Sequence, residues 1–266
     1  FACASSQADI DKLLAAPAYD ETLARRIFWY QWPFWGFQEY MDILKAAWQF
    51  NHSLPAGAPP FRILGLNSHM DWSYVWTPED RNNREAMKKV FAEGESDEVM
   101  AKTIKREVIE KHEKALIYSG CNHAYTRFHQ PIVDEKTGKL LELYAGRMGN
   151  QVYALIGDRC FNIFLHSPWQ PAISSNSEHV YPVEGAIDAL FAKLPPEKRR
   201  VGFDVAGSPF GKLTDTTSVW SRSSADFRLE NYCDGWIFQK PLSQYEGCTV
   251  PPDWITEANR LEAIAQ

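Results

Sequence analysis

Short apolar runs alternate with longer amphipathic stretches along the chain, and this alternation predicts strands separated by helices. The apolar runs have the length of strands and lie at residues 61–66, 115–119, 160–165, 200–205 and 235–238. Strands that are joined through helices favour right-handed crossover connections and parallel pairing. We therefore expect an α/β fold with a mainly parallel sheet and helices on both of its faces.

Helical periodicity, together with capping residues, predicts the segments between these strands. The predicted helices cover residues 6–16, 20–32, 36–51, 96–114, 148–156 and 182–194. A further helix start is expected at Thr77, which precedes Pro78 and two acidic residues. Residues 128–146 are largely polar and predict an excursion from the sheet with a turn at residues 136–139. No internal repeat divides the chain, so we expect a single α/β domain over residues 1–266.

Composition and charge exclude two classes of partner. Apolar residues make up 45% of the 266 positions and charged residues 23%, which is ordinary for a globular protein. The net charge of −6 repels phosphate backbones and long basic blocks are absent, so we expect no nucleic-acid partner. Apolar runs stay well below the roughly 18 residues of a membrane-spanning helix, so we expect no transmembrane segment.

The cysteines and the first residues indicate the compartment. A cysteine follows small residues in the segment 1–6, as in the remnant of a secretory or lipoprotein signal, although an arbitrary start has the same appearance. Cys233 and Cys248 bracket a loop-rich stretch and would pair in an exported protein; unpaired thiols of a cytosolic protein would show the same pattern. The balance favours export, to the periplasm as a soluble protein or lipoprotein, or to the extracellular space.

Three of the predicted strands run into a histidine. Residues 61–66 lead to His69 and Asp71, residues 115–119 lead to Gly120 and His123, and residues 160–165 lead to His166. Ligands of open parallel sheets bind beyond the carboxyl ends of the strands, so we expect the three imidazoles along one edge.

Each histidine alone is more often structural than functional, but three in the same relative position favour a site. Neutral imidazole suits a divalent metal, a general base or a haem iron. Gly120 allows a close approach of the backbone to a ligand beside His123. The motifs of zinc proteases, serine hydrolases and phosphate-binding loops are absent, and a buried structural role is favoured for Cys121.

Four segments resemble the superfamily that contains erythromycin esterases, ChaN-like haem-uptake proteins and Tiki/TraB proteins. Residues 98–104 resemble the family helix with Met-Ala and a following Ile, and residues 120–123 resemble its second Gly-x-x-His. Residues 147–158 are similar to the Met-Gly helix and Gly-Asp turn of the esterase branch. Residues 44–51, leading to Gly65, resemble the helix and strand before them. The resemblance covers about residues 39–166.

The resemblance implies a hydrolase that acts on a small-molecule or peptide ester or amide. His123 would be a general base or would bind a divalent metal, and Arg127 would stabilise an oxyanion. The metal set would be His69, Asp71, His123 and His166. One alternative is a haem- or metal-binding uptake protein, in which His123 or Tyr125 is an axial ligand beside Gly120. Another is an inert binding module with a degenerate site.

The chain departs from the family at its start. Family members open with a strand that ends in Gly-Glu-x-His and a second strand that carries a Glu, and neither precedes Phe61. Either the domain lacks these N-terminal strands, or this branch has lost that half of the site. The sequence leaves the substrate, the metal and the oligomeric state open.

Overall fold

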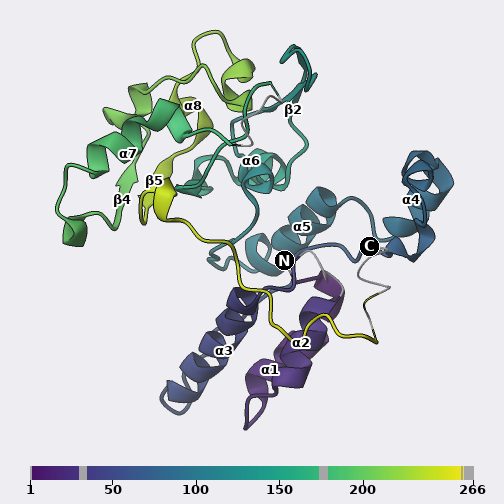
Figure 1. Ribbon diagram of the computed structural model, residues 1–266. Helices are drawn as coiled ribbons and strands as arrows, with labels where there is room; N and C mark the ends of the chain where they lie inside the picture. The colour runs from purple at the N-terminus through teal and green to yellow at the C-terminus, as the bar shows by residue number, and fades with distance from the viewer. Residues whose placement is uncertain (1, 30–34, 174–178, 259, 261–266) are drawn as a thin grey trace. The chain divides into compact units, whose positions relative to one another are not determined.

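The computed structural model describes residues 2–29, 35–173, 179–258 and 260, and the chain forms two compact units (Figure 1). The first unit contains Phe1–Ala115 and Gly247–Gln266, and the second contains Leu116–Glu246. The single domain expected from the sequence stays a prediction. In the part of the chain that the structure describes, no helix is both long and apolar enough to cross a membrane.

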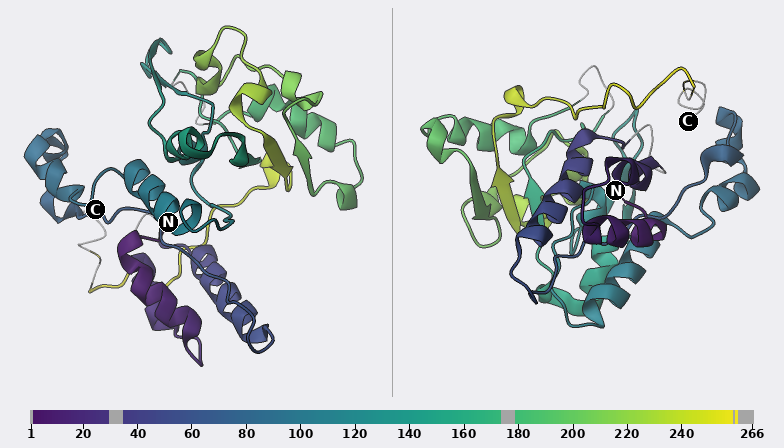
Figure 2. Two further views of the ribbon diagram at one scale, coloured as in Figure 1. Left: turned by 180° about the vertical axis from the view of Figure 1, so that it is seen from behind. Right: turned by 90° about the horizontal axis from the view of Figure 1, so that it is seen from below.

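The first unit is helical. Its helices are α1 (Gln7–Ala15), α2 (Glu21–Trp29), α3 (Gln38–Ser53), α4 (Arg84–Val90) and α5 (Ser96–Ile104). Each of α1, α2 and α3 buries one apolar stripe, so these three helices pack on one another around Ile10, Ile27 and Leu44 (Figures 1 and 2). The expected helices at residues 6–16, 20–32 and 36–51 are confirmed here apart from residues 30–32, which lie outside the described residues. The helix expected at residues 96–114 is shorter, because α5 ends at Ile104 and a π-helix continues only to Ile109.

The last described segment of the chain packs on this helical group. The Trp254 side chain is buried, and it covers Gly36 so closely that a Cβ at Gly36 would lie 2.6 Å from the indole ring. The backbone N–H of Gln38 donates to the carbonyl of Thr249, and Arg25 pairs with Asp253 at 2.8 Å. Residues far apart in sequence thus complete one apolar cluster.

The second unit contains two small sheets, so the expected mainly parallel sheet is wrong. One sheet has the strand order β3-β5-β4, where the strands are β3 (Ile163–Leu165), β4 (Val201–Asp204) and β5 (Gly235–Phe238). β3 pairs with β5 in parallel, whereas β4 pairs with β5 antiparallel. The other sheet is an antiparallel hairpin of β1 (Gln130–Val133) and β2 (Leu140–Tyr144), which lies in the predicted excursion and closes through the turn at residues 136–139.

Two of the predicted strands, at residues 61–66 and 115–119, do not form, and in the first of them the backbone groups find other partners. Asn51, near the end of α3, bonds both the N–H and the carbonyl of Phe61, and the N–H of Leu66 donates to Ala2. The segment 115–119 joins no ladder, and Leu116 in it is 93% exposed. The apolar composition of a short run therefore did not determine its pairing, and the expected row of three parallel strands is wrong.

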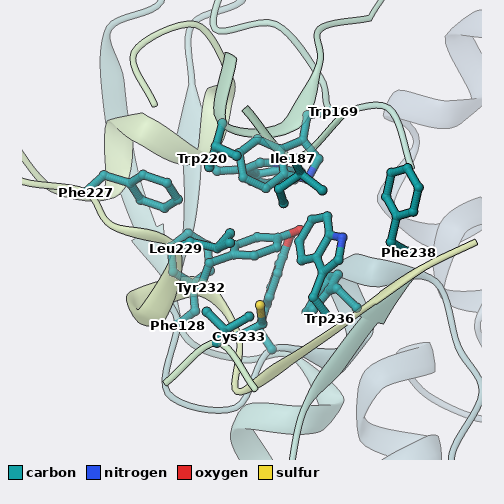
Figure 3. Packing of buried hydrophobic residues seen from close by; sticks show 14 of the residues in the cluster. Phe128, Trp169, Ile187, Trp220, Phe227, Leu229, Tyr232, Cys233, Trp236 and Phe238 are labelled. Atoms are coloured by element: carbon teal, nitrogen blue, oxygen red, sulfur yellow. The ribbon is translucent and has the colours of Figure 1, made fainter. Parts of the chain in front are cut away.

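The α-helices of the second unit are α6 (Met148–Ile156), α7 (Ala186–Phe191) and α8 (Leu229–Tyr232). α7 and α8 contribute side chains to the apolar cluster of the mixed sheet, whereas α6 packs on the turn Cys121–Ala124. Phe191 of α7 stacks on Phe238 of β5 with ring centroids 4.5 Å apart. Tyr232 lies among the rings of Phe128, Phe164 and Trp169 (Figure 3). Aromatic rings thus dominate the apolar cluster that fixes the sheet.

We expect Gly149→Ala to destabilise the protein by about 1–3 kcal/mol. A Cβ at Gly149 would lie 2.4 Å from the carbonyl oxygen of Tyr125, so the start of α6 would have to move away. Urea denaturation of Leu155→Ala, an exposed position in the same helix, should change little. Equal unfolding midpoints for the two variants would contradict the close packing of α6.

Candidate functional site

His123 lies on a short 3₁₀ turn, Cys121–Ala124, and its side chain is half-buried. The backbone N–H of His123 donates to the carbonyl of Gly120, and a Cβ at Gly120 would meet His123 Cδ2 at 3.6 Å. The turn is held from the other side by α6, whose Gly149 packs against the backbone of Ala124. The backbone of the predicted general base is thus anchored, and its half-buried side chain remains partly accessible to solvent.

Tyr125 is fully buried and belongs to the aromatic cluster. Its ring contacts Phe164 and Tyr232, with centroids 5.8 Å and 5.5 Å away, and its hydroxyl donates to Asn122 Oδ1 at 3.1 Å. Burial raises the pKa of this phenol well above its ordinary value, so the hydroxyl stays neutral. This environment favours a structural role for Tyr125.

Arg127 is held by two carboxylates. Its guanidinium donates to Asp234 Oδ1 and lies 3.5 Å from Asp158 Oδ1. The second oxygen of Asp234 accepts the backbone N–H of Asn162 at 2.9 Å, and the Asn162 amide donates to the carbonyl of Ala124 at 2.8 Å. Asp234 therefore links the segment of the predicted base to the beginning of the mixed sheet.

His166 follows β3 and is fully buried beside Asp188 of α7. Its Nε2 atom lies 2.8 Å from Asp188 Oδ2, although the ring N–H is not aligned for a hydrogen bond. The other carboxylate oxygen accepts the backbone N–H of Leu242 at 3.0 Å. The rings of Trp236 and Phe238 lie 5.8 Å and 4.8 Å from the imidazole. A histidine and a carboxylate thus meet in an apolar enclosure.

The second imidazole nitrogen, Nδ1, is buried and has no hydrogen-bond partner among the described residues. Burial lowers the pKa of His166, and the charge of Asp188 opposes this effect without overcoming it. An unsatisfied buried nitrogen is costly, and a perturbed histidine beside a carboxylate is a common feature of active sites. The indole N–H of the adjoining Trp236 is likewise buried and unsatisfied within the described part of the chain.

The helix that carries Asp188 begins after a strained turn. Val183, Glu184 and Gly185 all have positive φ angles, of 45°, 56° and 80°. A β-branched residue rarely adopts this conformation, yet Val183 is buried in the core and Glu184 accepts both the N–H and the hydroxyl of Thr216. Such strain persists where surrounding contacts over-determine the backbone, and it concentrates at functional sites.

The other two predicted metal ligands, His69 and Asp71, lie in the first unit and interact with each other. Hydrogen bonds from Ser73 lower the pKa of the Asp71 carboxylate, with a smaller contribution from the charge of His69. The N–H of His69 donates to Glu93 at 2.9 Å. In the described ranges, no group of three or more His, Cys, Asp and Glu side chains lies close enough together to hold a metal ion.

Sequence reasoning named His166 but missed Asp188. The available signal was an acidic residue inside the apolar stretch of the predicted helix at residues 182–194. That position alone is equally typical of an exposed helix face, and only tertiary packing places it beside His166. No protein-family model, curated protein or solved structure matches the chain.

We expect Asp234→Ala to destabilise the protein by about 1–3 kcal/mol, because it leaves the buried N–H of Asn162 without an acceptor and frees Arg127. Asp158→Ala is the matched control, since Asp158 touches the same guanidinium but is exposed. That variant should change the free energy of unfolding by less than about 0.5 kcal/mol. Chemical denaturation of both variants measures this difference, and a larger effect at Asp158 would contradict the network.

The lowered pKa of His166 predicts a pH dependence of stability. The unfolded chain gains the proton near the ordinary histidine value of about 6.5, and the folded protein gains it only at lower pH. The free energy of unfolding should therefore fall as the pH drops through about 6.5. Urea denaturation at several pH values should show a weaker fall in His166→Gln, and an equal fall in both proteins would exclude His166 as its source.

Proposed function

We propose that the chain is a histidine-dependent hydrolase of an ester or amide, and that His166, oriented by Asp188, is its general base. The observation that carries this proposal is the buried pair itself, in which one imidazole nitrogen lies 2.8 Å from a carboxylate while the other has no described partner. This is the arrangement of a base that is oriented through one nitrogen and works through the other. The ester or amide substrate rests on the sequence resemblance.

The chemistry follows from the two nitrogens. Nδ1 takes a proton from a water molecule while the water oxygen forms a bond to the carbonyl carbon. The resulting imidazolium is stabilised by the Asp188 carboxylate on its Nε2 side. The same proton then passes to the leaving alkoxide or amine as its bond to carbon breaks, which returns His166 to the neutral form. The unpaired indole N–H of Trp236 is a donor available for the developing oxyanion.

The lowered pKa of His166 suits this role. A base must be unprotonated at the working pH, and burial lowers the pKa of His166 below its ordinary value, which favours the neutral imidazole. The apolar walls formed by Trp236 and Phe238 strengthen the interaction with Asp188, because few water dipoles screen it. The turn with positive φ angles directly precedes α7, the helix that carries the carboxylate, and such strain is typical of functional sites.

His166→Gln should lower kcat/KM for p-nitrophenyl acetate at least about 100-fold, the usual contribution of a general base. Glutamine keeps a similar volume and a polar group, so the loss would reflect the missing base. Asp188→Asn, which changes the positioning residue, should lower kcat less and should shift the acid limb of the pH–rate profile.

The exposed His129 provides the matched control, and His129→Gln should hydrolyse the ester at the parent rate. His123→Gln discriminates between the two candidate bases, because His123 is the accessible alternative. Full activity in His166→Gln, or loss of activity in His123→Gln alone, would contradict the assignment. Circular dichroism and urea denaturation of each variant separate lost chemistry from lost folding.

A further inference from the structure

The pair of His166 and Asp188 is covered by a segment that is itself poorly buried. Residues 239–246, which we call the strap, continue directly from β5 (Figure 2). None of these residues is buried. The strap includes the short 3₁₀ turn Leu242–Gln244, whose hydrogen bonds are internal: Gln244 donates to Pro241 and Tyr245 donates to Leu242. The strap also lies outside the apolar cluster of the second unit.

Two hydrogen bonds attach the strap to the rest of the second unit among the residues that the structure describes, and both end on the same pair. The backbone N–H of Leu242 donates to Asp188 Oδ1 at 3.0 Å, and the hydroxyl of Tyr245 donates to the backbone carbonyl of His166. Burial raises the pKa of Tyr245, so this hydroxyl remains protonated and able to donate. Lys240 lies over the Tyr245 ring at 5.4 Å, within the strap itself.

The strap is less buried than the residues that it contacts. Phe238, immediately before the strap, is fully buried, and so is His166. Segments with few buried apolar contacts and few anchoring hydrogen bonds open more often than the core beneath them. The strap contacts the pair through these two hydrogen bonds and through the Tyr245 ring, whose centroid lies 6.4 Å from that of the imidazole.

We propose that the strap is a gate, which shields the His166–Asp188 pair when closed and admits water and substrate when its two hydrogen bonds open. The admission of substrate rests on the proposed function, whereas the opening of the strap over His166 does not depend on it. The gate is latched by the groups it protects, since Asp188 and the carbonyl of His166 accept both bonds. Opening therefore breaks both bonds at the pair itself, because the N–H of Leu242 leaves Asp188 and the hydroxyl of Tyr245 leaves the carbonyl of His166.

Carbethoxylation of the full chain by diethyl pyrocarbonate tests the gate, with the modified histidines identified by peptide mass spectrometry. His166 is fully buried, so its modification requires opening, whereas the exposed His129 reports the intrinsic reaction. Tyr245→Phe keeps the ring and removes one latch bond, and it should raise the rate at His166 about fivefold relative to His129. Ser243→Ala, an exposed position in the strap, should leave that ratio unchanged.

Two outcomes would overturn the gate. One is an equal rate at His166 in Tyr245→Phe and the parent protein. The other is a rate at His166 that follows the global unfolding rate measured in urea, because opening would then involve the whole unit. Hydrolysis of p-nitrophenyl acetate separates this inference from the proposed function: faster modification of His166 without any hydrolysis would retain the gate and reject the hydrolase.

Discussion

The parallel pairing of β3 with β5 is the constraint on which the second unit depends. Before the first paired residues, Asp234 accepts the N–H of Asn162 through its side chain and donates its own N–H to the Asn162 carbonyl. After the last paired residues, the backbone N–H of His166 donates to the carbonyl of Ile237. The register between these points turns Phe164 and Trp236 inward together. Because His166 continues the same alternation, it too must face the core, and its polar ring becomes a buried group that requires a partner.

Asp188 is that partner, and the aromatic walls determine what the pair can do. In a wet environment an imidazole and a carboxylate exchange protons with water and interact weakly. Beside Trp236 and Phe238 the imidazole lies 2.8 Å from the carboxylate through Nε2, and its Nδ1 has no partner among the described residues. The enclosure also isolates the imidazole from solvent, so in the proposed function access and chemistry depend on different parts of the unit.

Local signals predicted part of this structure and tertiary pairing decided the rest. The run at residues 235–238 and the helix at residues 148–156 were predictable, because dense apolar residues and clear end signals coincide there. The strand order was not predictable, because β5, the partner of β3, lies some seventy residues away along the chain. Nothing in the local sequence favours β5 over residues 115–119 as that partner. The resemblance drew attention to His123, whereas the environment of His166 depends on α7 and the strap, whose positions no motif encodes.

The left-handed turn at residues 183–185 has a consequence for how this chain tolerates change. Glu184 adopts a conformation that an asparagine or glycine would adopt at lower cost, so replacement there would relieve backbone strain while giving up the contacts to Thr216. Random variation selected for thermal stability would therefore tend to relax this turn. The helix α7 would then be free to shift. The protein would gain thermal stability, but the Asp188 carboxylate would be held less firmly beside His166.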